Sequence, residues 1–257
     1  MEKDKGSKER FGYEWDKYNK IIPNYEIQFL KWVFPLVKKD FKNKRVLDAG
    51  CGIGRNSYWP LKYGAKQVHA FDYDKRTISS AKKNLSMFSN CKVFYDSIYN
   101  INYKNYFDIS FSIGVIHHLD NPKKAVKNLI KATKKNGKIL IWVYGYEGNE
   151  WIVHYINPIR VITSKLPSNL THLISYFFSI PLYAYLKFSK PKSKYLNQIS
   201  KFRFWHVHSI VFDQLIPRIA NYWKKEEAIN LFNIKDLKDI KAYRINNNSW
   251  TVIAIKK

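Results

Sequence analysis

The chain has 257 residues and a formal net charge of +25, with 45 Lys and Arg against 20 Asp and Glu. This length can bury one full core. Two cysteines exclude a disulfide framework, and no run of about 20 apolar residues predicts a membrane span. The charge attracts polyanions, but lysine is spread over nearly every segment together with Asn, Ile and Tyr. This distribution favours a general compositional bias over a dedicated basic patch.

The first residues predict a polar tail followed by a helix. Residues 1–10 are charged and have no apolar core, so we expect a disordered tail, no signal peptide and a cytoplasmic location. Apolar residues at helical spacing from Tyr25 to Leu36 then predict a helix. Tyr13 and Trp15 precede that helix and can pack against it.

A glycine-rich corner follows the first predicted strand, residues 46–49. Gly50, Gly52 and Gly54 alternate directly after that strand and before residues that can start a helix. Glycines allow close approach of a ligand, and the N–H groups of a helix start favour an anion. A dinucleotide site needs a small residue where this chain has Arg55, which argues against NAD. Asp48 just before the turn suits a ligand that carries an ammonium group.

Two further predicted strands also end in acids. Residues 68–72 end at Asp72, 22 residues after Gly50, where a carboxylate can accept from both hydroxyls of a ribose. Asp74 lies beyond the expected strand end and is the less favoured ribose partner. A helix over 76–85 precedes the third strand, 91–97, which includes Asp96. Turn chemistry alone does not explain why three consecutive predicted strands each end in an acid, at Asp48, Asp72 and Asp96.

The next stretch predicts a fourth strand from Phe107, followed by Gly114 and the pair His117-His118. Asn121 and Pro122 are typical of a helix start. We expect that helix to run to about Lys135 and to be capped by Gly137. An apolar fifth strand, 138–144, comes next.

The end of the chain predicts a helix over 224–232, capped by Asn233 in the left-handed conformation. Residues 237–245 and 249–255, joined by three asparagines, then predict a β-hairpin.

Together, the glycine corner, the three strand-end acids and the stretch 107–122 resemble the class I S-adenosylmethionine-dependent methyltransferases, in their small-molecule or cell-surface "type 11"-like branch. The resemblance implies an α/β three-layer sandwich. Its sheet is mostly parallel, seven-stranded and Rossmann-like, with a C-terminal antiparallel hairpin and a helical insertion after the fifth strand. The expected parts of this single domain are a tail 1–10, a helical lid 11–45, a cofactor-binding core 46–145, a substrate insertion 146–222 and a last helix with hairpin 223–257.

The same resemblance implies S-adenosylmethionine as the cofactor. Asp96 would accept from the adenine amino group, the N–H of Ser97 would meet the adenine ring, and Tyr13 and Trp15 would belong to the lid. The cofactor-binding residues expected on this basis are Tyr13, Trp15, Asp48, Gly50, Cys51, Gly52, Asp72, Tyr73, Asp96, Ser97, Ile113 and Gly114.

The insertion is unusually aromatic and apolar. It follows the fifth strand at the edge where ligands bind, so we expect it to cover the active site. It can pack a core of its own, line an apolar pocket, or rest on a bilayer with the help of the lysines after residue 186. Residues 202–209 alternate as in an extended segment, which would place His206 and His208 on one face near Asp213. We expect substrate contact from these three and Tyr144, and no metal site.

The predicted reaction is methyl transfer, most simply to an oxygen of a small-molecule, sugar or lipid-linked acceptor. A hydroxyl acceptor needs a base, for which His117 and His118 are the candidates. Residues 112–115 lack the Asp/Asn-Pro-Pro-aromatic motif of base-amino methyltransferases, and neither cysteine has a Pro-Cys context. An RNA methyltransferase, or a basic membrane- or RNA-binding module on a degenerate methyltransferase fold, stays as the alternative. The sequence indicates no obligate protein partner and leaves open a peripheral contact with an anionic membrane.

Overall fold

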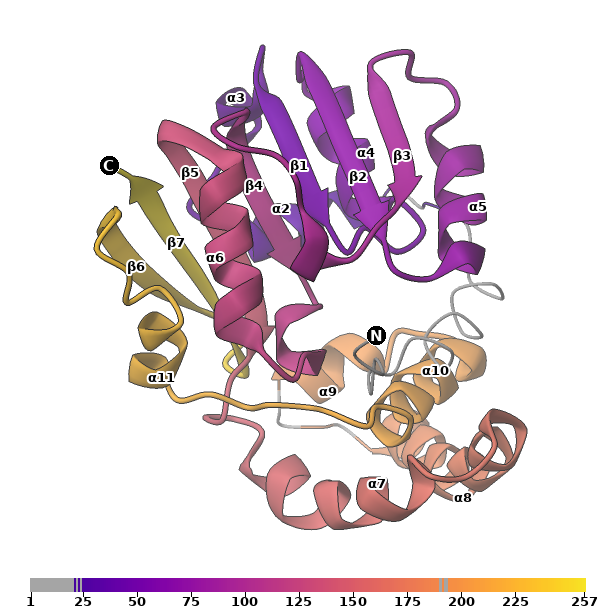
Figure 1. Cartoon of the computed structure of the whole chain (residues 1–257). Coiled ribbons are helices and arrows are strands. Elements are labelled where there is room, and N and C mark those ends of the chain that lie inside the picture. Colours follow the sequence, from indigo (N-terminus) through magenta and orange to yellow (C-terminus); the bar gives the residue numbers. More distant parts are fainter. Residues whose placement is uncertain (1–20, 22, 24, 190, 192–193) are drawn as a thin grey trace.

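The computed structural model describes residues 21–257 except 22, 24, 190 and 192–193. The expected tail and the lid residues Tyr13 and Trp15 therefore lie outside the described residues. Within the described part, seven strands form one sheet in the order β3-β2-β1-β4-β5-β7-β6 (Figure 1). β1 to β5 are parallel and β7 is antiparallel to both of its neighbours. The strands are β1 (Arg45–Ala49), β2 (Gln67–Asp72), β3 (Cys91–Tyr95), β4 (Phe107–Ile113), β5 (Thr133–Tyr144), β6 (Leu237–Ile245) and β7 (Ser249–Lys256).

Helices cover both faces of this sheet, which makes the expected three-layer sandwich. α6 and α11 lie on one face, and α2 and α4 on the other (Figure 1). The helices are α2 (Tyr25–Trp32), α3 (Lys38–Phe41), α4 (Arg55–Lys62), α5 (Lys75–Leu85), α6 (Pro122–Ala132), α7 (Asn157–Thr163), α8 (Ser168–Phe188), α9 (Lys194–Ile199), α10 (Phe204–Leu215) and α11 (Lys225–Asn230). Short helical turns are η1 (Ile98–Asn100), η2 (Ile116–His118) and η3 (Ile152–Ile156).

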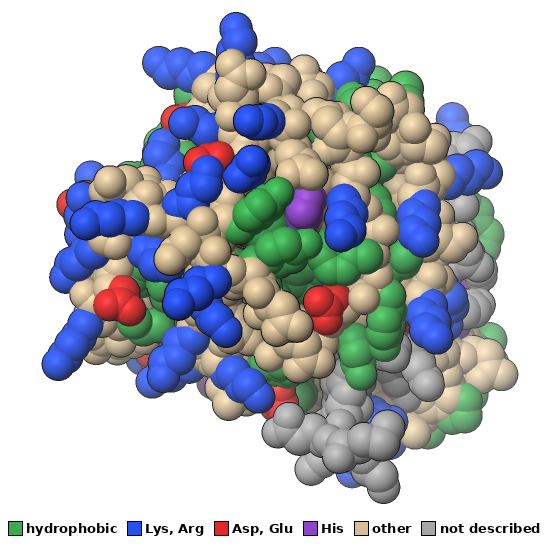
Figure 2. Space-filling model, turned by 45° about the horizontal axis from the view of Figure 1, so that its top comes forward, with side chains coloured by type: hydrophobic (Ala, Val, Ile, Leu, Met, Phe, Trp, Pro, Cys, Tyr) green, Lys and Arg blue, Asp and Glu red, His purple; other side chains and the backbone are tan. Residues whose placement is uncertain are grey.

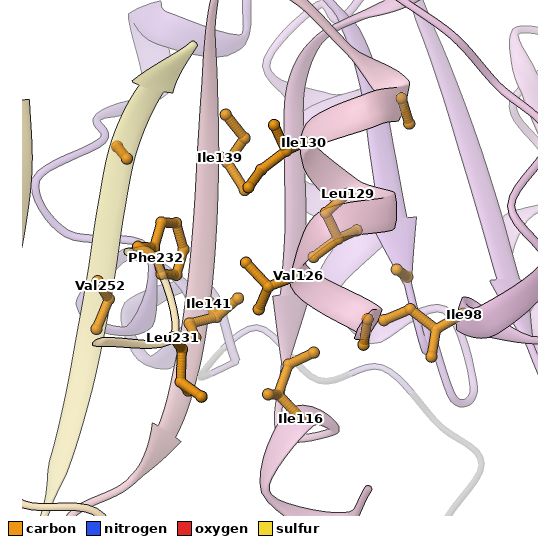
Figure 3. Close-up of a cluster of buried hydrophobic side chains, with 14 of the residues drawn as sticks. Ile98, Ile116, Val126, Leu129, Ile130, Ile139, Ile141, Leu231, Phe232 and Val252 are labelled. Atoms are coloured by element: carbon orange, nitrogen blue, oxygen red, sulfur yellow. The ribbon is translucent and has the colours of Figure 1, made fainter. Parts of the chain in front are cut away.

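The core beneath α6 follows from its sequence. Val126, Leu129 and Ile130 recur at helical spacing and point into the sheet, where they meet Ile139 and Ile141 of β5 (Figure 3). Asn121 caps the helix, as expected, because its side-chain oxygen accepts from the backbone N–H of Lys124 at 3.1 Å.

The terminal hairpin is also confirmed. Residues 246–248 connect the two strands, and Asn246 and Asn247 adopt positive φ values of 51° and 63°, a conformation that asparagine tolerates better than most residues. Ile245 pairs with Ser249, so the strands are in register directly beside the turn.

Two helix ends differ from the sequence prediction. α6 ends at Ala132 and not near Lys135, because Thr133 is extended and its hydroxyl donates to the carbonyl of Leu129 at 2.7 Å. Gly137 is therefore not its cap and lies within β5, where the pairing with β4 shifts register. α11 ends at Asn230, and Asn233 is not among the residues with positive φ.

The helices between β5 and α11 stand at the carboxyl ends of the parallel strands (Figure 1). α8 and α10 pack against each other, with a small core of Leu186, Ile199 and Val207. The expectation of an extended segment over 202–209 is wrong, because residues from Phe204 onward belong to α10. The alternating pattern of this segment is also compatible with a helix, because Phe204, Val207 and His208 lie on one face of α10.

Candidate active site

The glycine corner connects β1 to α4 and is held by the neighbouring strand. The N–H groups of Gly50 and Cys51 both donate to the carbonyl of Phe71 at 2.9 Å, and Gly52 donates to the carboxylate of Asp72 at 2.8 Å. Gly50, Gly52 and Gly54 have φ values of 83°, 53° and 83°. Only glycine adopts these conformations without strain.

The first two glycines of this corner differ in what surrounds them. A Cβ on Gly50 would lie 2.3 Å from Val115 Cγ2, so this glycine is needed by the protein's own packing. A Cβ on Gly52 would meet no atom of the described residues within 4 Å, so this part of the chain leaves room for a ligand to approach Gly52. Cys51 between them is buried, and burial raises the pKa of its thiol well above the ordinary value, so the thiol stays neutral.

Asp48 is fully buried at the end of β1. One carboxylate oxygen accepts from the hydroxyl of Ser57 at 2.6 Å, and the other has no hydrogen-bond partner among the described residues. Burial raises the pKa of this carboxyl to about 7. A buried carboxylate oxygen without a donor fits the ammonium group of an amino-acid ligand.

Asp72 lies where the ribose of such a ligand is expected. Its oxygens accept from the backbone N–H groups of Gly52 and Asp74 at 2.8 and 3.0 Å. These bonds fix the carboxylate and leave lone pairs for two further donors. Asp74 is used elsewhere, because it caps α5 and forms an ion pair with Arg76 at 2.7 Å.

The remaining cofactor candidates continue along the same edge. Tyr73 stacks on Tyr95 with ring centroids 5.4 Å apart. Asp96 follows β3, and one of its carboxylate oxygens accepts from the N–H of Ser97 at 2.8 Å. That N–H, expected to meet the adenine ring, is therefore already paired with a side chain. Ile113 is the last residue of β4 and Gly114 follows it, with its N–H donating to the carbonyl of Trp142 at 3.2 Å.

The structure brings His117 and Tyr144 together, with stacked rings whose centroids lie 3.7 Å apart. His117 is fully buried, and neither ring nitrogen has a hydrogen-bond partner among the described residues. Burial lowers its pKa well below the ordinary value, so the imidazole is neutral at pH 7. His118 differs, because its Nδ1 donates to the carbonyl of Ile219 at 2.7 Å, and burial lowers its pKa to about 4.

These rings belong to a longer series that we call the aromatic wall, comprising Trp32, Trp142, His117, Tyr144 and Tyr222. Successive centroid distances along it are 4.8, 6.0, 3.7 and 5.4 Å. A guanidinium lies over each end of the wall, at 5.2 Å from the Trp32 ring for Arg55 and at 5.8 Å from the Tyr222 ring for Arg160.

Sequence reasoning missed Arg160 and Tyr222. Arg160 is buried and donates to the side chains of Asn157 and Tyr222 and to both oxygens of Gln214. No acid of the described residues forms an ion pair with it. Nothing in the sequence around position 160 distinguishes it from a surface residue. The alternation of Trp142 and Tyr144 on β5 was the available signal for the wall.

The insertion residues proposed as substrate contacts separate in the structure. His206 is partly buried, and burial and the charge of Arg55 lower its pKa. His208 is buried between α8 and α10, where it contacts Ser179 at 2.7 Å and His172 at 3.2 Å. Asp213 is half-buried on α10, next to the Gln214 that binds Arg160. Within the described ranges, no three His, Cys, Asp or Glu side chains are placed to hold a metal.

Comparison with known proteins identifies this architecture. Residues 47–141 match the family described as methyltransferase domain. The tRNA U34 carboxymethyltransferase of Helicobacter pylori (strain Shi470) is 28% identical over 117 residues, which cover 44% of this chain and 45% of that protein. The mitochondrial ubiquinone biosynthesis O-methyltransferase of Dictyostelium discoideum is 31% identical over 126 residues, which cover 44% of this chain and 38% of that protein. The chain thus spans less than half the length of these relatives.

A solved structure supports the fold over nearly the whole chain. The magnesium protoporphyrin IX methyltransferase of Synechocystis PCC 6803, solved with bound S-adenosylhomocysteine (SAH), superimposes with a TM-score of 0.53 and 10% identity over 96% of this chain and 84% of that one. The unpaired Asp48 oxygen and the open space at Gly52 fit the cofactor of this class. Residues 47–141 therefore carry a methyltransferase domain within a class I, Rossmann-like fold, and S-adenosylmethionine is the cofactor that this domain implies.

Proposed function

We propose that the protein transfers the methyl group of S-adenosylmethionine to an oxygen atom of a small-molecule, sugar or lipid-linked acceptor. The bound cofactor would supply a methyl group on a positively charged sulfur, and its neutral thioether product, SAH, is a good leaving group. The protein then has to position the acceptor about 3 Å from that methyl and to exclude water. A hydroxyl acceptor also needs a group that takes its proton.

The observation that carries this proposal is the imidazole of His117. It is neutral, fully buried and lacks hydrogen-bond partners among the described residues, and it stacks on Tyr144 at the carboxyl edge of the sheet. A neutral imidazole can accept a proton from a hydroxyl, whereas a protonated one cannot. His118 is the weaker candidate, because its Nδ1 is bound to the Ile219 carbonyl.

Access to His117 requires movement of the segment 216–222. The N–H of Asn221 donates to the carbonyl of His117 at 2.8 Å, and Tyr222 covers Tyr144. An acceptor can therefore reach the imidazole only when this segment opens. Its closure would then exclude water from the reaction.

The proposed cofactor contacts follow the same edge of the sheet. Asp48 would hold the ammonium group of S-adenosylmethionine, the corner Gly50–Cys51–Gly52 its amino-acid end, and Asp72 its ribose. Tyr73, Asp96 and Ser97 would surround the adenine, with Ile113 and Gly114 beside it. The described geometry supports Asp48 and Asp72 most directly, through one unpaired oxygen and one carboxylate held by two N–H groups.

RNA is the second candidate acceptor. It is favoured by the net charge of +25 and by the similarity to an enzyme named for its action on tRNA. A cavity of about 540 Å³ lined by six lysines also lies on the molecule, but none of the candidate site residues lines it.

The test is a screen for SAH formation with phenols, catechols, polyprenylated phenols, sugars and total tRNA. We expect turnover with a hydroxyl acceptor. His117→Asn should lower kcat at least tenfold and remove the pH dependence of kcat due to the base, while His118→Asn should change kcat less. Turnover on tRNA alone would contradict the proposal. Cofactor binding without turnover on any class would favour the degenerate, non-catalytic alternative.

A further inference from the structure

The outward face of α8 carries large apolar side chains at helical spacing. Leu170, Leu173, Phe177, Ile180 and Phe188 are all exposed, with 59% of Leu173, 78% of Phe177 and 91% of Phe188 accessible. We call these five residues the α8 ridge. A helix of 21 residues extends about 31 Å, so the ridge runs along most of one side of the insertion.

The buried side of α8 carries mostly small polar side chains. Thr171, Ser175 and Ser179 are fully buried there, one turn apart, together with Leu186. The hydroxyl of Thr171 donates to the carbonyl of Thr163 at 3.0 Å. Two of these hydroxyls contact the ring of His208, at 3.5 Å from Ser175 and 2.7 Å from Ser179. A helix that belongs only to a folded core places its large apolar residues inside and its small polar ones outside. An exposed apolar face of this kind marks a surface that contacts a partner.

Neighbouring elements also carry exposed apolar side chains. Val161 and Ile162 of α7, Trp151 and Tyr155 before it, and Trp205 of α10 are exposed as well. Trp and Tyr are the residues that favour the boundary between water and lipid headgroups. In Figure 1, α8 lies on the far side of α10 from the sheet, at the outer surface of the insertion.

The charge around the ridge indicates which surface it contacts. Residues 151–222 contain nine Lys and Arg and one acid, Asp213. Lys165, Lys187 and Lys201 are exposed beside or beyond the ends of α8. A second copy of this chain would bring two strongly positive faces together, which opposes self-association. An anionic bilayer offers both the opposite charge and an apolar interior.

We infer that the α8 ridge docks the protein onto an anionic membrane surface. No helix of the described residues is long and apolar enough to cross a bilayer, so α8 lies in the plane of the interface with the ridge among the acyl chains. Lysines at its ends contact the headgroups. This orientation places the outer side of the insertion on the membrane. It does not depend on which acceptor the site uses.

The test is flotation of the full chain with vesicles of phosphatidylcholine containing 30 mol% phosphatidylglycerol. Phe177→Ser/Phe188→Ser removes two exposed phenyl rings, and Ile27→Ser/Met87→Ser removes two exposed apolar side chains from elsewhere. We expect the ridge variant to lose at least tenfold in partition coefficient, because two phenyl rings no longer enter the apolar region of the bilayer. The control variant should bind as the wild type does, and vesicles without the anionic lipid should bind more weakly.

Three results would overturn the inference. Equal binding of the ridge variant and the wild type would mean that charge alone attracts the protein to vesicles. Absence of vesicle binding by the folded wild type would exclude the membrane. A wild-type dimer in sedimentation that becomes a monomer in the ridge variant, without vesicle binding, would assign the ridge to a second copy. Circular dichroism and thermal unfolding establish that both variants are folded, and the assay needs neither cofactor nor acceptor.

Discussion

At the scale of single residues, two glycines of the glycine corner have different roles: Gly50 is required by the packing of the protein, and Gly52 leaves room for the cofactor. Gly50 has no room for a Cβ because Val115 packs on it, whereas a Cβ on Gly52 would meet no atom of the described part of the chain within 4 Å. Both have positive φ, so alanine costs about 1–2 kcal/mol of backbone strain at either position.

Gly50→Ala should therefore mainly reduce stability, whereas Gly52→Ala should mainly reduce cofactor affinity. Gly50→Ala adds a steric clash and should lower the free energy of unfolding by about 3 kcal/mol in total. Gly52→Ala should keep most of the stability and weaken S-adenosylmethionine binding at least tenfold, because its methyl group occupies cofactor space. Urea unfolding and calorimetric titration measure the two effects. Equal cofactor affinity of Gly52→Ala and the wild type would place the ligand elsewhere.

Asp48 should make the stability of the cofactor-free protein depend on pH. Its pKa is about 7 in the folded state and about 3.8 in the unfolded state, so between these values the folded protein binds more protons. The free energy of unfolding should consequently fall as the pH rises from 4 to 7. Asp48→Asn should flatten this fall and should bind S-adenosylmethionine at least tenfold more weakly, since a neutral amide is a poorer partner for an ammonium. Urea unfolding at several pH values measures the slope. An unchanged slope in Asp48→Asn would assign the pH dependence to other groups.

At the scale of elements, Arg160 joins the insertion to the aromatic wall. It links α7 to the end of α10 and to Tyr222, which stacks on Tyr144. Its guanidinium satisfies acceptors that would otherwise be buried without a donor.

Arg160→Met should therefore lower the free energy of unfolding by about 3 kcal/mol, because several buried oxygens lose their donors. Lys165→Met, an exposed neighbour, should change it by less than about 0.5 kcal/mol. Thermal and urea unfolding compare the two. A loss for Arg160→Met no larger than that for Lys165→Met would show that the guanidinium does not hold the insertion to the wall.

Elements with strong local signals were predictable from the sequence. The strands of the parallel sheet, the Asn121 cap of α6 and the hairpin turn at Asn246 and Asn247 follow from apolar runs and turn residues close to each other in the chain. The glycine corner and its neighbouring acids could be named for the same reason. The end of α6 could not, because it depends on Thr133 bonding back to Leu129. The contact between Tyr222 and Tyr144 could not be predicted either, because the two residues are 78 positions apart in the sequence and only the fold brings them together.

At the scale of the whole molecule, the positive charge is distributed and not concentrated. Lys and Arg side chains lie across the whole visible face with few acids among them (Figure 2). A cavity of about 540 Å³ is lined by Lys104, Lys127, Lys131, Lys135, Lys256 and Lys257. A field of this kind binds polyanions with little preference for one site.

Reversing the charge of two lysines should therefore weaken RNA binding to the same extent wherever on the surface the two lysines lie. Lys127→Glu/Lys131→Glu in the cavity and Lys82→Glu/Lys83→Glu on α5 remove the same charge, and their affinities for a fluorescent 20-nucleotide oligouridylate should agree within about threefold. Fluorescence anisotropy at several salt concentrations measures this. A loss confined to the cavity variant would establish a dedicated RNA site and favour RNA as the acceptor.

The central claim is that this chain binds S-adenosylmethionine at the carboxyl edge of its sheet. Isothermal titration with S-adenosylmethionine and with SAH tests it most directly, using the wild type, Asp72→Ala, Asp72→Asn and the exposed control Asp236→Ala. The account predicts micromolar binding to the wild type and the control and at least a tenfold loss in both Asp72 variants, with each protein shown to be folded by circular dichroism. Absence of binding to the folded wild type, or unchanged affinity in both Asp72 variants, would contradict it.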